Sequence, residues 1–131
     1  MFVTSHGHAY GQFRRALRTG NSRLAEDAAR ELPVLGLADA LELCLLYRGD
    51  AERYERAAAR WIAKLMAEHP GTRLDELELI AAALRGLAGR GAGQAAAALE
   101  AKLRLSGMAD VAARLADDRR PTTGRPPPQR G

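Results

Sequence analysis

The sequence predicts an all-α protein, and three observations support this prediction. Apolar residues make up 47% of the 131 positions but aromatic residues only 5%, so the core must consist mainly of alanine and leucine, which favour helices. Valine, isoleucine and threonine, which favour strands, together number only ten. Apolar residues also recur at spacings of three and four between glycine and proline breaks. We therefore expect a compact bundle, or an irregular stack of antiparallel helical hairpins, with six or seven short helices.

The first two helices are predicted over residues 8–18 and 22–32. Gly20 suits the left-handed position after a helix, and Asn21 or Ser22 can accept a hydrogen bond from the free N–H groups of the next helix. The apolar stripes of these two helices are expected to comprise Tyr10, Phe13, Leu17, Leu24, Ala25, Ala28 and Leu32.

The third predicted helix, residues 37–48, is apolar on most sides. Asp39 and Glu42, about 60° apart at 100° per residue, give it its only polar face before the terminal Arg48. A helix that is apolar nearly all round is buried against several neighbours. We therefore expect this helix to be the central one.

Four more helices follow. Asp50 is placed to cap the first of them, and Thr72 with Asp75 is an approximate capping box for the second. The four helices are predicted over residues 51–68, 72–88, 94–105 and 108–117. The stripe of the second is expected to comprise Leu74, Leu77, Ala81, Leu84 and Ala88, with Ile80 and Leu87 beside it, and that of the last Met108, Val111, Ala112 and Leu115.

These helices are predicted to form a single domain over residues 8–118. It follows a flexible N-terminus of residues 1–7 and precedes a disordered, basic, proline-rich tail of residues 119–131. The tail holds four arginines and no acid, whereas the preceding 118 residues hold 16 Lys+Arg and 16 Asp+Glu. The formal net charge of +4 therefore comes from the tail and does not indicate a basic domain.

The sequence also indicates a compartment. Cys44 is the one cysteine and lies in the apolar run LELCLLY, and a single buried thiol is typical of a reducing environment. No apolar run approaches the ~20 residues of a membrane span. The N-terminal residues lack the charged-then-apolar order of a signal peptide. We expect a cytoplasmic protein without membrane contact.

The stretch RYERAAARWIAK is the most distinctive on the predicted helix of residues 51–68. Tyr54 and Trp61 point into its apolar stripe, where we expect them to be buried. Four cations fall within an arc of about 80° at the edge of that stripe: Arg53, Arg56, Arg60 and Lys64. Such an arc is either a partner contact or a solvated face whose arginine stems cover the apolar edge.

A second basic cluster lies on the first helix and consists of Arg14, Arg15 and Arg18, with Arg23 beyond it. The two clusters would form one positive patch if the first helix lay beside the fourth. The sequence also allows two separate solvated surfaces, because it contains no contact information between these helices.

Two stretches of this chain, FRRALRTGNSRLAEDAARELP and LADALELCLLYRGDAERYERAAARWIAKL, resemble small all-helical proteins of high-GC bacteria. The resemblance covers roughly residues 10–87. It implies a helical fold, and because that group brings no established activity or site, it implies no function.

No catalytic residue, cofactor or metal is predicted. The glycine-rich stretch GLAGRGAGQ follows a helix and lacks both the strand and the Lys-Ser/Thr pair of phosphate-binding loops. His6, His8 and His69 lie near a terminus or a helix end without cysteine or carboxylate ligands beside them. The sequence contains no Ser-His-Asp or Cys-His order with supporting context.

We therefore expect a non-catalytic interaction module that binds a protein partner, or a second copy of itself, through grooves between helix hairpins. The alternative is a nucleic-acid-associated protein that binds phosphates without sequence preference, with strong salt dependence, and that also uses the basic tail. The candidate contact residues are the same in both: Arg14, Arg15, Arg18, Arg53, Arg56, Arg60 and Lys64.

Overall fold

The computed structural model describes residues 5–119, which form seven helices and no strand over that range. The predicted all-α class is thereby confirmed. In chain order the helices are α1 (Ser5–Thr19), α2 (Ser22–Arg30), α3 (Leu37–Leu45), α4 (Ala51–Glu68), α5 (Leu74–Leu87), α6 (Ala92–Leu105) and α7 (Ala109–Arg119).

Several helix boundaries follow the local signals in the sequence. Gly20 has a φ of 77°, in the left-handed region that glycine adopts without strain. The Asn21 side chain accepts a hydrogen bond from the Leu24 N–H at 3.0 Å, and the Asp50 side chain accepts one from the Arg53 N–H at 3.2 Å. Each bond satisfies a donor that the first turn of a helix leaves without an intrahelical partner.

The N-cap residue of α5 is Arg73, one residue after the predicted Thr72. The Arg73 N–H donates to the Glu76 carboxylate at 2.8 Å, whereas the Thr72 hydroxyl donates to the His69 carbonyl at 2.6 Å. Thr72 therefore closes the turn after α4. The predicted capping box of Thr72 and Asp75 is wrong, because the carboxylate that accepts the free N–H is that of Glu76 and the N–H belongs to Arg73.

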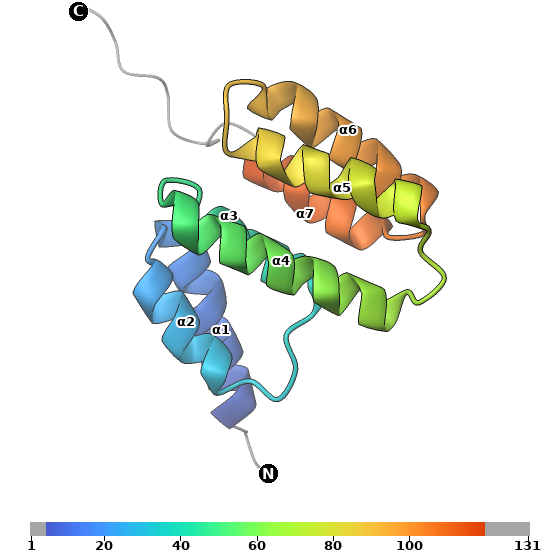
Figure 1. The fold of residues 1–131 in the computed structure, drawn as a ribbon. Helices are drawn as coiled ribbons and strands as arrows, with labels where there is room; N and C mark the ends of the chain where they lie inside the picture. Colours follow the sequence, from blue (N-terminus) through green and yellow to red (C-terminus); the bar gives the residue numbers. More distant parts are fainter. Residues whose placement is uncertain (1–4, 120–131) are drawn as a thin grey trace, which may run out of the picture.

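The helices are arranged in three tiers (Figure 1). Helices α1 and α2 form a hairpin at one end, α3 and α4 form the middle tier, and α5, α6 and α7 pack together at the other end. Helix α3 contacts α2, α4 and α7, so it is the central helix, as its composition predicts. The α4–α5 contact is less extensive than the α5–α6 and α6–α7 contacts.

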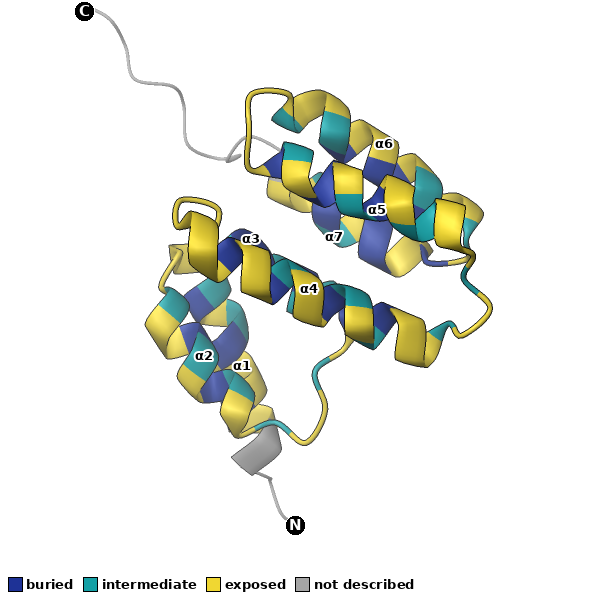
Figure 2. Cartoon of the chain, viewed as in Figure 1, coloured by how far each residue is buried: buried dark blue, intermediate teal, exposed yellow. Residues whose placement is uncertain are grey.

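Every helix has buried positions alternating with exposed ones (Figure 2), and the buried apolar side chains form two clusters. The larger cluster extends from α3 to α7 and includes Leu41, Trp61 and Leu99, each at most 2% exposed. Leu43 of α3 and Leu46, the residue after α3, pack against the smaller cluster. The smaller cluster lies in the α1–α2 hairpin and consists of Phe13, Ala16, Ala25 and Ala28.

The buried faces of α1 and α2 differ from the predicted stripes. Tyr10 and Leu24 are 40% and 56% exposed, although both were expected in the core, whereas Ala9 and Ala16 are buried. Alanine side chains at the contact let the two helix backbones approach closely, so small residues occupy the interface and larger ones lie at its edges. The Tyr10 ring still packs against Phe13, with 6.3 Å between ring centroids.

The buried face of α5 is also rotated from the predicted one. Leu74 is 73% exposed and Ala88 is exposed, because α5 turns a different side toward α6. A Cβ atom added at Gly86 would lie 2.7 Å from the Cβ of Ala95, so the glycine allows the two helices to touch. The buried residues of α5 are Ile80, Ala83, Leu84 and Leu87.

Parts of the predicted terminal segments lie outside the described residues, namely 1–4 and 120–131. Residues 5–7 belong to α1, and Arg119 is the last residue of α7. Within residues 5–119, none of the helices combines the length and apolar character needed to cross a bilayer.

Candidate functional site

A groove of about 400 Å³ lies where α2, α3 and α4 meet. Its floor and walls are contributed by these three helices, by Leu35 in the α2–α3 connection and by Tyr47 in the α3–α4 turn. Two of the predicted partner-binding cations, Arg60 and Lys64, line it. The groove is therefore the place where the apolar–basic edge of α4 meets a concave surface.

The floor of the groove is apolar and fixed in place. It includes Leu43 and Cys44 of α3 and Trp61 of α4, and the Trp61 side chain is buried as predicted. The Trp61 indole N–H donates to the Leu37 carbonyl at 2.9 Å. This bond satisfies the only polar group of the indole and holds the ring against the start of α3.

Tyr47 joins two sides of the groove. Its hydroxyl donates a hydrogen bond to the Glu26 carboxylate on α2. The guanidinium carbon of Arg53 lies 5.5 Å from the centroid of the Tyr47 ring, within the range of a cation–π contact. Arg53 thus contacts Tyr47, which lines the groove, although Arg53 does not line the groove itself.

The Cys44 thiol is not a nucleophile at neutral pH. Burial raises the pKa of Cys44 to about 12, although the charges of Arg60 and Arg48 act in the opposite direction. The thiolate is the reactive form of cysteine, and desolvation disfavours it. Cys44 therefore acts as a small apolar side chain, as its sequence context predicts.

The rim of the groove is mainly basic. Arg30 lies on the α2 wall, where it pairs with Asp27 at 2.8 Å, and Lys64 pairs with Glu68 at 3.2 Å. Arg60 lines the groove without an ion pair to any described residue. The rim therefore carries one cation whose charge is not balanced by a neighbouring carboxylate.

The other predicted contact residues lie elsewhere. Arg56 pairs with Glu52 at 3.4 Å on the exposed side of α4. Arg15 lines a separate hollow between α1 and α2, and Arg18 is exposed near the end of α1. Because α1 packs on α2 while α4 packs on α3 and α5, the two predicted clusters belong to different helix pairs.

Arg14 points inward to the polar face of α3 rather than to solvent. It donates to Glu42 at 2.6 Å, and Arg114 of α7 donates to Asp39 at 2.6 Å and also to Glu42. The Tyr10 hydroxyl lies 3.4 Å from Asp39. These five residues form an ion network that connects α1, α3 and α7.

Asp39 and Glu42 stabilise the charge of Arg114. Burial opposes that charge, but the hydrogen bond and charge of Asp39, together with Glu42, outweigh it and raise the Arg114 pKa above its ordinary value. Asp39 is only 8% exposed, and a buried carboxylate needs such partners. The network is a structural connection between helices and lies apart from the groove.

The glycine-rich stretch joins α5 to α6 as a helix–helix turn. The described residues contain no group of three or more His, Cys, Asp or Glu side chains that could hold a metal ion. Comparison with known protein families, curated proteins and solved structures finds no match for this chain.

The sequence reasoning found the α4 side of the groove but not the α2 side. Glu26, Ala29 and Arg30 line the groove, and none was a candidate contact residue. Their one signal was the strong polar–apolar asymmetry of α2. The asymmetry within α2 does not determine which neighbouring helices its polar residues lie next to.

Proposed function

We propose that this chain is a non-catalytic interaction module that holds a segment of a partner protein in the α2–α3–α4 groove. The observation that carries the proposal is the apolar floor around Trp61 beneath a rim that contains Arg60 and Lys64. Apolar anchors surrounded by charged residues are the usual pattern of helix-groove recognition. The volume of about 400 Å³ falls in the range of roughly 300–1,000 Å³ that is usual for binding pockets, and suits a few anchor side chains.

Binding rather than catalysis is proposed because the polar groups inside the groove already have partners. The Tyr47 hydroxyl donates to Glu26, and the Trp61 indole N–H donates to Leu37. The Cys44 thiol stays protonated because its pKa is about 12. None of these groups is poised to transfer a proton or to attack a substrate.

The nucleic-acid alternative has weaker support. Of the predicted contact residues, Arg14, Arg56 and Lys64 pair with carboxylates of this chain. Residues 1–118 also carry equal numbers of basic and acidic side chains, 16 of each. A sequence-independent phosphate surface needs several cations in one place, without acids between them.

The proposal is tested by selecting binders from a random peptide library and mapping them by backbone NMR. Selected peptides are expected to shift resonances of groove residues and to lose binding to Ala29→Phe, which fills the groove from α2. The matched control is Ala98→Phe, on the exposed side of α6, which should bind as the wild type does. Equal binding to both variants, or no peptide that shifts groove resonances, would contradict the proposal.

Two further measurements separate the alternatives. If sedimentation shows dimers that dissociate in Ala29→Phe but not in Ala98→Phe, the groove is occupied by a second copy of the chain. Fluorescence anisotropy with labelled duplex DNA and single-stranded RNA tests the nucleic-acid alternative. Binding that weakens steeply with salt in both full-length protein and a 1–118 chain would favour that alternative.

A further inference from the structure

We infer that the segment bound in the α2–α3–α4 groove is acidic, with an apolar side chain against the partly buried Leu35 and Leu43 and a carboxylate at Arg60. This inference rests on the proposed function and adds the chemistry of the partner. The charged side chains lining the groove are Arg30, Arg60, Lys64 and Glu26, three cations against one acid. Arg30 pairs with Asp27 and Lys64 pairs with Glu68, so Arg60 is the cation of the lining that has no ion pair to a described residue.

Arg60 is the main attachment point for a partner carboxylate. It makes no ion pair with a described residue, and its charge acts on the Cys44 thiol of the groove floor. Arg60 is an exposed residue at the edge of the groove, so its guanidinium is accessible to a partner carboxylate. Its fork of donors also matches the two oxygens of a carboxylate.

Lys64 is the second α4 cation that lines the groove, and Arg56 lies outside the groove one turn before Arg60. Arg56, Arg60 and Lys64 are spaced four residues apart, which places them about 6 Å from one another along the helix axis. Arg56 and Lys64 pair with Glu52 and Glu68 within the same helix. Such i,i+4 pairs at the surface are weak, so an incoming carboxylate can replace the intramolecular partner.

A carboxylate-bearing segment fits this surface better than a nucleic acid does. The acids Glu26, Glu52 and Glu68 lie among the cations and would repel a continuous row of phosphates. Separate carboxylates spaced along a peptide can lie between them. The apolar floor also takes an aliphatic or aromatic side chain, which a phosphate backbone does not offer.

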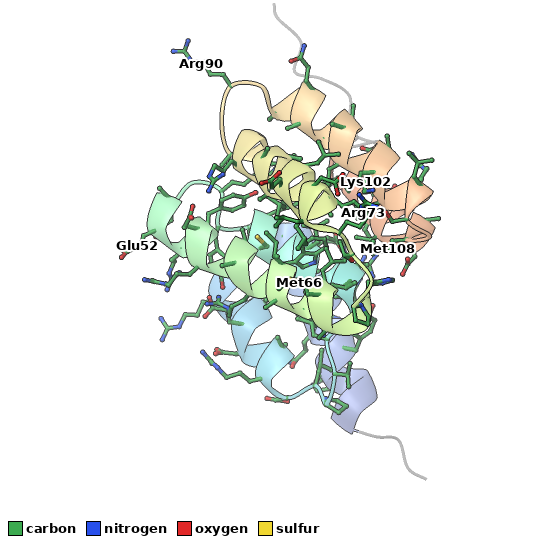
Figure 3. All side chains as sticks on the ribbon, turned by 45° about the vertical axis from the view of Figure 1, so that its right-hand side comes forward. Glu52, Met66, Arg73, Arg90, Lys102 and Met108 are labelled. Carbon is green, nitrogen blue, oxygen red and sulfur yellow. The ribbon has the colours of Figure 1, made fainter. Side chains whose placement is uncertain are left out.

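The test compares peptide pools selected from one random library on the full chain and on charge-reversed variants. Peptides selected on the wild type should be enriched in Asp and Glu over the input library. The enrichment should vanish in peptides selected on Arg60→Glu and persist in those selected on Arg90→Glu. Arg90 is the matched control because it extends from the α5–α6 turn, on a different tier from the groove (Figure 3).

Individual binders give the second readout. Replacing the acidic residues of a selected peptide by Gln should weaken its binding to the wild type about tenfold. The same replacement should have less effect on binding to Arg60→Gln, a milder variant in case Arg60→Glu fails to fold. Groove-binding peptides without acid enrichment, or equal affinity for acidic and Gln peptides, would overturn the inference and leave the proposed function standing.

The remaining outcomes are also decisive. If no selected peptide shifts groove resonances, the proposed function fails and the inference fails with it. If duplex DNA binds the wild type but not Arg60→Glu, and the peptides that bind the groove carry no excess of acidic residues, the groove rim binds phosphate and the acidic-peptide assignment is overturned.

Discussion

The guanidinium of Arg114 lies 2.6 Å from a carboxylate oxygen of Asp39, so α7 is joined to a helix 75 residues earlier in the chain. The two side chains are 22% and 11% exposed, which makes this ion pair better shielded than the pairs on the outer surface of α4. Arg114→Met leaves Asp39 with only the longer contacts to Arg14 and Tyr10. The expected loss in the free energy of unfolding is about 1–3 kcal/mol, because a nearly buried charge loses its main partner.

Urea denaturation of Arg114→Met measures this loss. Arg85→Met is the matched control, since Arg85 is an exposed helical arginine without an ion pair to a described residue, and its effect should stay within about 0.5 kcal/mol. If both variants unfolded at the same urea concentration, the ion network would have no stabilising role.

Replacement of two helical glycines by alanine should change stability in opposite directions. A Cβ at Gly86 meets the Cβ of Ala95 at 2.7 Å, whereas a Cβ at Gly11 meets no atom within 4 Å. Gly86→Ala should lower the free energy of unfolding by about 1–3 kcal/mol, because α5 and α6 must move apart. Gly11→Ala should raise it by up to about 1 kcal/mol through helix propensity alone.

Thermal or urea unfolding of the two glycine variants checks this prediction. A stabilised Gly86→Ala would mean that α5 and α6 are not in close contact at this position.

The buried Cys44 thiol should make the protein less stable in alkaline solution. The folded-state pKa of about 12 is higher than the ~8.5 of an exposed thiol in an unfolded chain. Its contribution to stability is therefore fully present below pH ~8.5 and is lost as the pH rises toward 12, at up to about 1.4 kcal/mol per pH unit. The measurement is the urea midpoint between pH 8 and pH 10, which should fall less steeply in Cys44→Ala.

Thiol labelling provides an independent check on Cys44. At pH 8 an aromatic disulfide reagent should label the folded protein far more slowly than the urea-unfolded protein, because only the exposed thiolate reacts. Rapid labelling of the folded protein would show that the Cys44 sulfur is exposed to solvent rather than buried.

The contribution of Glu76, at the start of α5, to the free energy of unfolding should decrease in acid. The Glu76 carboxylate accepts hydrogen bonds from the Arg73 N–H and from Lys102 of α6, and these contacts lower its pKa. Lys102 and Arg73 lie at the same end of the α5–α6 pair (Figure 3). Stability from Glu76 is therefore present above the pKa of an unfolded glutamate and is lost as the pH falls through the lowered folded-state value.

Unfolding of Glu76→Gln between pH 5 and pH 2 tests this dependence. The variant should show a shallower loss of stability with acid than the wild type. Glu78→Gln, on the exposed side of the same helix, serves as the control and should follow the wild-type curve. Parallel curves for the wild type and Glu76→Gln would contradict the assignment.

Features that depend on neighbouring residues were predictable from the sequence. The bonds of Asn21 and Asp50, the left-handed Gly20 and the burial of Trp61 all follow from local chemistry or from one helix's periodicity. The apolar composition around Cys44 also predicted the central helix. Each of these signals is contained within about one or two helical turns.

Features that depend on which helices meet were not predictable. Arg14 was a candidate contact residue, yet it pairs with Glu42 because α1 presents this face to α3. Leu74 was expected in the core and is exposed because α5 turns another side to α6. For the candidate site, Arg60 and Lys64 were found from the arc on α4, but Arg30 joins them only through the placement of α2.

The small apolar cluster of the α1–α2 hairpin has a consequence for the groove. The α2 wall belongs to the hairpin, whereas the floor around Trp61 belongs to the larger cluster. The hairpin is held to α3 mainly by Leu43, Leu46 and a few polar bonds. The groove thus lies between two apolar clusters of unequal size, so a substitution in the smaller cluster should alter the α2 wall while leaving the residues of the floor in the larger cluster packed.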